Sequence, residues 1–100
     1  MRLSAQQVQS IRHAAQAAFG KGTEVWLFGS RVDDAKKGGD IDLLVRPVPG
    51  VAGQFFAQKI KMLTMLERML GERKVDVVIE QPNDPRPIVE VARSTGIQLQ

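Results

Sequence analysis

The stretch from residue 25 to residue 45 constrains the fold more than any other part of the chain. Residues 25–28 form a short aromatic and β-branched run, which is typical of a buried strand. Gly29 permits a sharp turn and the close approach of a ligand. Ser30 is suited to cap a helical turn, whose free N–H groups can hold an anion. The stretch therefore predicts a strand, an anion-binding turn, a polar connection and a second strand.

The second strand opens with two acidic side chains, Asp40 and Asp42. Residues two apart in a strand project to the same face, so the two carboxylates are expected to lie together. Like charges at this spacing repel each other, and a cation between them relieves the repulsion. Ligands that offer only oxygen favour a hard divalent ion such as Mg²⁺. The pair therefore predicts a magnesium site.

A third acid, Asp76, interrupts another strand-like run at residues 74–79. A single carboxylate among β-branched residues is costly to bury without a partner. If this strand lies beside the strand that carries Asp42, all three acids reach one site. Three acids next to a phosphate-binding turn are the parts required for metal-assisted phosphoryl or nucleotidyl transfer.

The order Gly29-Ser30, Asp40-x-Asp42 and then Asp76 resembles the signature of the DNA polymerase β-like nucleotidyltransferases. The shortness of the chain resembles their minimal nucleotidyltransferase branch. The resemblance implies that the Gly-Ser turn holds the terminal phosphates of the nucleotide, with ATP as the donor. It also implies that Asp40 and Asp42 bind Mg²⁺. Asp76 would share a second, catalytic ion and activate the attacking hydroxyl group.

The connection between the turn and the acids leaves its roles open. Arg31 either contacts the nucleotide phosphates or pairs with an acid such as Asp34, and we include it in the expected nucleotide-binding set. Asp33 and Asp34 are expected to act locally, near the start of a short helical turn.

Composition sets the class of protein. With 100 residues, 43% of them hydrophobic, the chain is expected to form one domain over residues 1–100. It has no cysteine, which excludes disulfides and thiolate metal sites. No apolar run approaches a membrane-spanning length, and we expect a cytoplasmic protein without a membrane partner. The net charge is +3 and the pI about 9.7, but the basic residues are dispersed, so nucleic acid is a less favoured partner.

The predicted element order is α-β-α-β-α-β-α, an α/β or α+β domain with a small mixed sheet backed by helices. The first helix is expected to begin at Ser4, which forms a capping box with Gln7, and to end before Gly20. A short helix is predicted at residues 31–35 and the longest at residues 53–70. After the third strand we expect a final helix at residues 88–94 and an edge strand at residues 97–100.

Two expectations concern the surfaces of the helices. The apolar residues of the longest helix cover more than half of its circumference. Either this helix is sandwiched between the sheet and the last helix, or one side of it forms a partner surface. The residues proposed for that surface are Phe55, Met62, Met65 and Met69. In the last helix, Ile88, Val91 and Ala92 are expected to face inward.

The resemblance also suggests what the chain acts on. Minimal nucleotidyltransferases are often paired with a helical HEPN-type protein, frequently an RNase toxin. Our leading hypothesis is an antitoxin that transfers AMP from ATP to a hydroxyl group of such a toxin. The alternative is a module that neutralises its partner by contact alone, without catalysis. An Asp76→Asn variant distinguishes the two.

Overall fold

A computed structural model describes residues 3–29, 41–48, 55–71 and 74–100. The elements, in chain order, are α1 (Ala5–Phe19), β1 (Glu24–Phe28), β2 (Ile41–Arg46), α2 (Phe55–Leu70), β3 (Val75–Ile79), α3 (Pro87–Thr95) and β4 (Ile97–Gln98). The short helix expected at residues 31–35 lies outside the described residues. The other predicted helices and strands are all present, and the final strand is shorter than expected.

The four strands form one mixed sheet in the order β3-β2-β1-β4. β1 pairs antiparallel with β2 and with β4, whereas β2 pairs parallel with β3. A parallel pair needs a crossover connection, and α2 provides it between β2 and β3. The predicted mixed sheet is confirmed.

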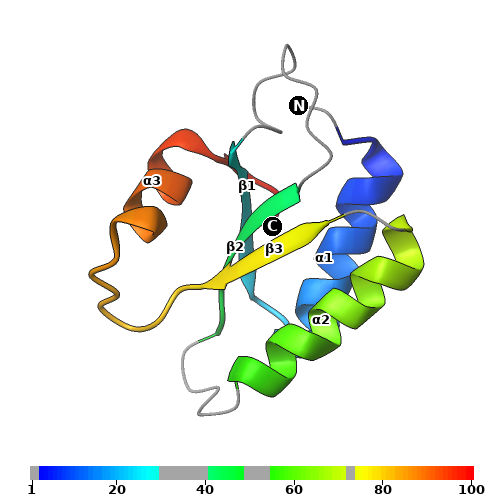
Figure 1. Cartoon of the computed structure of the whole chain (residues 1–100). Coiled ribbons are helices and arrows are strands. Elements are labelled where there is room, and N and C mark those ends of the chain that lie inside the picture. The colour runs from blue at the N-terminus through cyan, green and yellow to red at the C-terminus, as the bar shows by residue number, and fades with distance from the viewer. Residues whose placement is uncertain (1–2, 30–40, 49–54, 72–73) are drawn as a thin grey trace.

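The helices cover the two faces of the sheet unequally. α1 and α2 lie together on one side, and α3 lies alone on the other (Figure 1). Alternation along β2 serves both sides: Leu43 and Val45 join the core under α1 and α2, while Leu44 joins the smaller cluster under α3. That smaller cluster also contains Trp26, Phe28, Val89 and Ala92.

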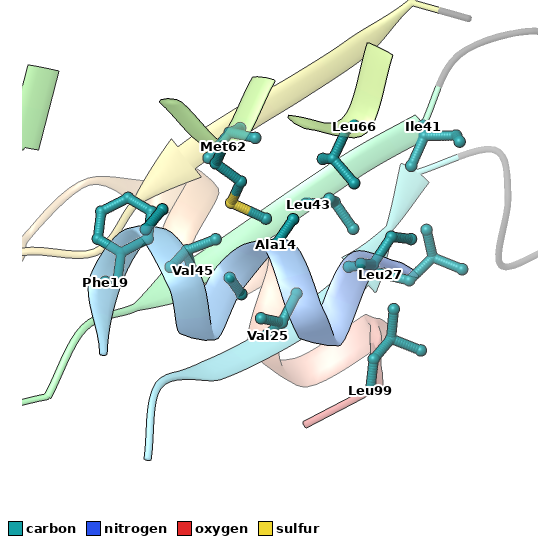
Figure 2. Close-up of a cluster of buried hydrophobic side chains, with 14 of the residues drawn as sticks. Ala14, Phe19, Val25, Leu27, Ile41, Leu43, Val45, Met62, Leu66 and Leu99 are labelled. Carbon is teal, nitrogen blue, oxygen red and sulfur yellow. The ribbon is translucent and has the colours of Figure 1, made fainter. Parts of the chain in front are cut away.

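The larger core fills the space between the sheet and the two helices α1 and α2 (Figure 2). Phe19 from α1, Leu27 from β1, and Met62 and Leu66 from α2 are all at most 1% exposed. Each such side chain stabilises the fold by roughly 1.5–3 kcal/mol relative to exposure. This core holds β1 and β2 in place from one side, and α3 packs on part of their other side.

The ends of α1 form as the sequence predicts. The Oγ of Ser4 accepts a hydrogen bond from the backbone N–H of Gln7 at 3.1 Å, and the backbone N–H of Ser4 donates to Gln7 Oε1 at 2.8 Å. This reciprocal capping box satisfies two amide groups that the first turn leaves without partners. The helix ends at Gly20, whose φ is 107°.

The expected sandwich of α2 between the sheet and the last helix is wrong. α2 packs against α1 and β3, and α3 lies on the opposite face of the sheet. The proposed partner surface is also largely wrong, because Met62 is fully buried in the core and Phe55 and Met65 pack against it. The apolar side chains of α2 that are exposed are Phe56 (78%), Ile60 (47%) and Met69 (43%). None of the helices in the described ranges is long and apolar enough to cross a membrane.

The inward face of α3 also differs from expectation. Ala92 is buried as predicted, but its partner is Val89, whereas Ile88 and Val91 are 40% and 50% exposed. The sheet contributes Trp26 and Phe28 to this interface, and α3 turns the side with its smaller residue, Ala92, toward these large rings. α3 has two apolar stripes, one with Val89 and Ala92 and one with Ile88 and Val91. The sequence pattern does not indicate which of them packs against the rings of Trp26 and Phe28.

Candidate active site

Asp42 and Asp76 lie directly opposite each other on neighbouring strands. β2 and β3 pair with Asp42 in register with Asp76, followed by Leu44 with Val78. Neighbouring strands are about 4.8 Å apart, and residues in register project to the same face. That face is the α3 side, because Leu44 and Val78 belong to the cluster under α3. Parallel pairing therefore brings two acids that are far apart in the sequence to one spot.

Gly29 brings the end of β1 against the same spot. Its φ of 79° lies in the left-handed region that side chains rarely adopt. A Cβ added to Gly29 would overlap Oδ2 of Asp42 and lie 3.2 Å from Cγ of Asp42. The antiparallel register places Phe28, the residue before Gly29, opposite Asp42. Glycine is therefore required here both for the turn and for the approach of the carboxylate.

The end of the sheet that carries Asp42 and Asp76, called here the acid end, is exposed to solvent at Asp76 on the α3 side. Asp42 is half-buried and Asp76 is exposed. α3 covers the neighbouring part of this face and ends at Gly96, where an added Cβ would lie 2.7 Å from the carbonyl oxygen of Leu27. The close packing at Gly96 holds the end of α3 against β1, beside the acids. A substrate can therefore approach Asp76 from the solvent.

The remaining predicted site residues, Ser30, Arg31 and Asp40, lie outside the described residues. In the part of the chain that the structure describes, no group of three histidine, cysteine, aspartate or glutamate side chains could hold a metal ion. Of the three predicted acids, the structure brings two together, Asp42 and Asp76.

These two acids fit a divalent cation by their chemistry. Two carboxylates in register on adjacent strands concentrate negative charge, and they offer the oxygen ligands that Mg²⁺ prefers. The glycine at position 29 leaves room for one of these carboxylates. Both residues could therefore take part in holding such an ion.

A second polar cluster occupies the far end of the same face. It lines a groove of about 610 Å³ between α3 and the ends of β2 and β3. The carboxylate of Glu80 is 11% exposed, and its Oε2 lies 3.3 Å from Nη1 of Arg93 and 3.9 Å from Nε of Arg46. The Arg93 guanidinium also stacks over Trp26, 5.5 Å from the ring centre. This cluster was not predicted from the sequence, although the period of two from Asp76 to Glu80 indicates that both side chains share a face.

The linker before α3 is held by one ion pair. Asp84, whose side chain is 3% exposed, accepts hydrogen bonds from the Arg86 guanidinium and from the backbone N–H of Gln81. These hydrogen bonds, the one from Arg86 first, hold the pKa of Asp84 well below its usual value. Arg86 also donates to the carbonyl oxygen of Ile79 at 2.6 Å. The pair thus fixes the path from β3 to α3.

Comparison with known proteins agrees with the geometry of the acid end. A search of curated proteins finds no match to the sequence. The model of the nucleotidyltransferase domain matches residues 8–95, which run from within α1 to the end of α3 and include β1 to β3. The fold and the two acids in register are consistent with this match, and nucleotidyl transfer is the activity class that it supports. The chain therefore belongs to the nucleotidyltransferase domain family.

Proposed function

We propose that this chain transfers a nucleoside monophosphate, AMP from ATP, onto a hydroxyl group of a partner protein. The observation that carries the proposal is the register that sets Asp42 directly opposite Asp76 at an open end of the sheet. A family of nucleotidyltransferases and a pair of adjacent carboxylates point to the same chemistry.

The proposed roles combine the register of Asp42 and Asp76 with the resemblance to the nucleotidyltransferases. Asp40, Asp42 and Asp76 would hold two Mg²⁺ ions, and bound Mg²⁺ would neutralise the charge of the triphosphate and lower the pKa of the acceptor hydroxyl. Asp76 also orients that hydroxyl and takes up its proton as the oxygen attacks the α-phosphorus. The bond from the α-phosphorus to the bridging oxygen breaks, and pyrophosphate leaves at the Gly29-Ser30 turn, where Arg31 contributes positive charge.

For the acceptor we propose a HEPN-type helical protein, with this chain as its antitoxin. The support is the resemblance to the minimal branch, in which such pairs are frequent. Two separate pairs of exposed apolar side chains, one on each face of the sheet, add support, because neighbouring exposed apolar residues often mark protein contacts. They are Phe56 and Ile60 on α2 and Ile88 and Val91 on α3.

The test uses ATP labelled at the α-phosphate, Mg²⁺ and the protein that co-purifies with the chain. We expect label on the partner with the unmodified chain and none with Asp76→Asn. Chelation of Mg²⁺ with EDTA is expected to abolish labelling. Labelling that persists in the variant would contradict the role of Asp76.

A second candidate is a module that binds and neutralises its partner without catalysis. Phe56 favours it, because this side chain is 78% exposed in a helix whose other side forms the core. Under this alternative, Asp76→Asn neutralises the partner as well as the unmodified chain, whereas Phe56→Ser does not. Under the proposed catalysis, Asp76→Asn fails to neutralise it.

A further inference from the structure

β3 is an edge strand, and alternate residues along it face in opposite directions. The carbonyl oxygen of Lys74 accepts a hydrogen bond from Ile41 at 2.9 Å, and the N–H of Glu80 donates to Val45 at 2.8 Å. Because backbone groups alternate with a period of two, the even-numbered residues 74–80 bond to β2. The N–H and C=O groups of residues 75, 77 and 79 therefore point away from the sheet.

This outer edge has no partner strand in the part of the chain that the structure describes. At one end, Arg86 already occupies the carbonyl oxygen of Ile79 at 2.6 Å. The groups that remain available are the N–H and C=O of Val75 and Val77, together with the N–H of Ile79. They form a short stretch on either side of Asp76 in the sequence.

We propose that the outer edge of β3 pairs with a short extended segment of the acceptor protein, which becomes an added strand beside Asp76. The inference rests on the proposed function. A residue on the added strand opposite Asp76 would lie about 4.8 Å from it and project to the same face. A Ser, Thr or Tyr at that position would present its hydroxyl group to the acids. Backbone pairing thus supplies affinity and register, and one side chain supplies the acceptor.

The length of the edge favours a transient segment over a second copy of this chain. Pairing of two copies through β3 would need the full strand, and Arg86 blocks its last carbonyl group. Stable dimers bury more than about 1,000 Å² in total, more than a ladder of two or three residues provides. The charge of Asp76 on the edge strand also discourages pairing between copies, because charged edge residues are a common protection against it.

The test measures amide hydrogen exchange by NMR in the ¹⁵N-labelled full chain. The probe is the peptide acetyl-Lys-Thr-Val-Tyr-Val-Thr-Lys-amide, added at ten times its dissociation constant. We expect exchange at Val75 and Val77 to slow about 10-fold, because only the unbound chain exchanges. Two control peptides carry N-methyl groups on alternate residues. In one peptide the methyl groups lie on the edge that pairs with β3, and this peptide is expected not to bind. In the other they lie on the opposite edge, and this peptide is expected to bind.

Three results would overturn the proposal. The first is unchanged exchange at Val75 and Val77 at saturating peptide. The second is equal binding of both methylated peptides. The third is strong protection of these amides from exchange in the chain without peptide. If that protection grows with chain concentration, the edge pairs with a second copy of the chain instead.

A second experiment, which measures nucleotidyl transfer to the peptide, separates this proposal from the proposed function. Val75→Pro removes one outward N–H at the first position of the strand, where proline is tolerated, and Val75→Thr is the matched control. We expect transfer to the unmodified peptide to fall at least 10-fold in Val75→Pro and to stay unchanged in Val75→Thr. Peptide that protects the edge without ever being labelled would contradict the proposed function alone. Equal labelling by the two variants would contradict the edge proposal alone.

Discussion

The two ends of the sheet face under α3 use carboxylates in opposite ways. At one end, Asp42 lies in register with a second carboxylate, Asp76, which makes no ion pair with any described residue. At the other end, four residues after Asp76 and directly after β3, Glu80 lies between the guanidinium groups of Arg46 and Arg93. Both ends are built from the same two strands, and the cluster under α3 separates them.

The difference shows how a binding end is distinguished from a structural end. Glu80 has its counter-charges from within the chain, so it holds α3 against the sheet. Asp42 and Asp76 place two like charges in register, and their mutual repulsion costs stability that a bound cation would restore. A cost of this kind is typical of functional sites. The acid end is therefore the place to look for activity, and the groove end for stability.

The largest expected effect comes from removing one acid. Asp42→Asn is expected to reduce nucleotidyl transfer about 10²- to 10⁴-fold, because it removes a charge that metal-assisted transfer needs. Glu80→Gln on the same face is the control and should retain activity. The measurement is transfer of labelled AMP, with circular dichroism to show that both variants fold. Loss of activity in both variants alike would erase the distinction between the ends.

The glycine beside Asp42 offers a second test. Gly29→Ala should reduce transfer about 10²-fold, because the new methyl group displaces the carboxylate of Asp42. Left-handed strain adds a destabilisation of about 1–2 kcal/mol. Gly71 has nearly the same φ, 80°, with nothing within 4 Å of an added Cβ. Gly71→Ala therefore introduces the backbone strain without a side-chain clash and is the control. If it lost as much activity as Gly29→Ala, the contact with Asp42 would not explain the loss of activity.

Stability in metal-free buffer should move in opposite directions at the two ends. Asp76→Asn removes repulsion from Asp42 and is expected to raise the free energy of unfolding by about 0.2–1 kcal/mol. Glu80→Gln removes the carboxylate charge between two guanidinium groups that are nearly half-exposed, and should lower it by about 1 kcal/mol or less. Urea denaturation at low ionic strength measures both. A change of the same sign in the two variants would contradict the comparison.

The smallest expected effect is on thermal stability at low pH, through the carboxylate of Asp84. The pKa of Asp84 is lower in the folded chain than its unfolded value of about 4, so its anion stabilises the fold fully above that pH. The contribution is lost as the pH falls below 4 toward the folded pKa. Asp84→Asn should therefore lower the melting temperature at pH 7. Below pH 4, the melting temperature of this variant should fall less than that of the unmodified chain. Parallel melting curves for the two chains across this range would exclude the role of Asp84.

Local patterns in the sequence predicted much of the fold. The capping box of Ser4 and Gln7, the strand runs and the glycine at position 20 are short-range features, and the structure contains each of them. The choice of Ile88 and Val91 as inward residues failed because two stripes of α3 are apolar. Only the shape of the sheet under the helix selects between them.

The sequence by itself predicted which residues carry the chemistry, and the period of a strand determined that Asp76, Val78 and Glu80 share a face. It also determined that position 29 must turn sharply. The tertiary structure alone decided the register between β2 and β3, which sets Asp76 opposite Asp42. A shift of one residue would have sent Asp76 to the core, and nothing in either strand alone fixes that register. The core on the other face, where Leu43 and Val77 pack in one cluster with Met62 and Leu66 of α2, stabilises this register.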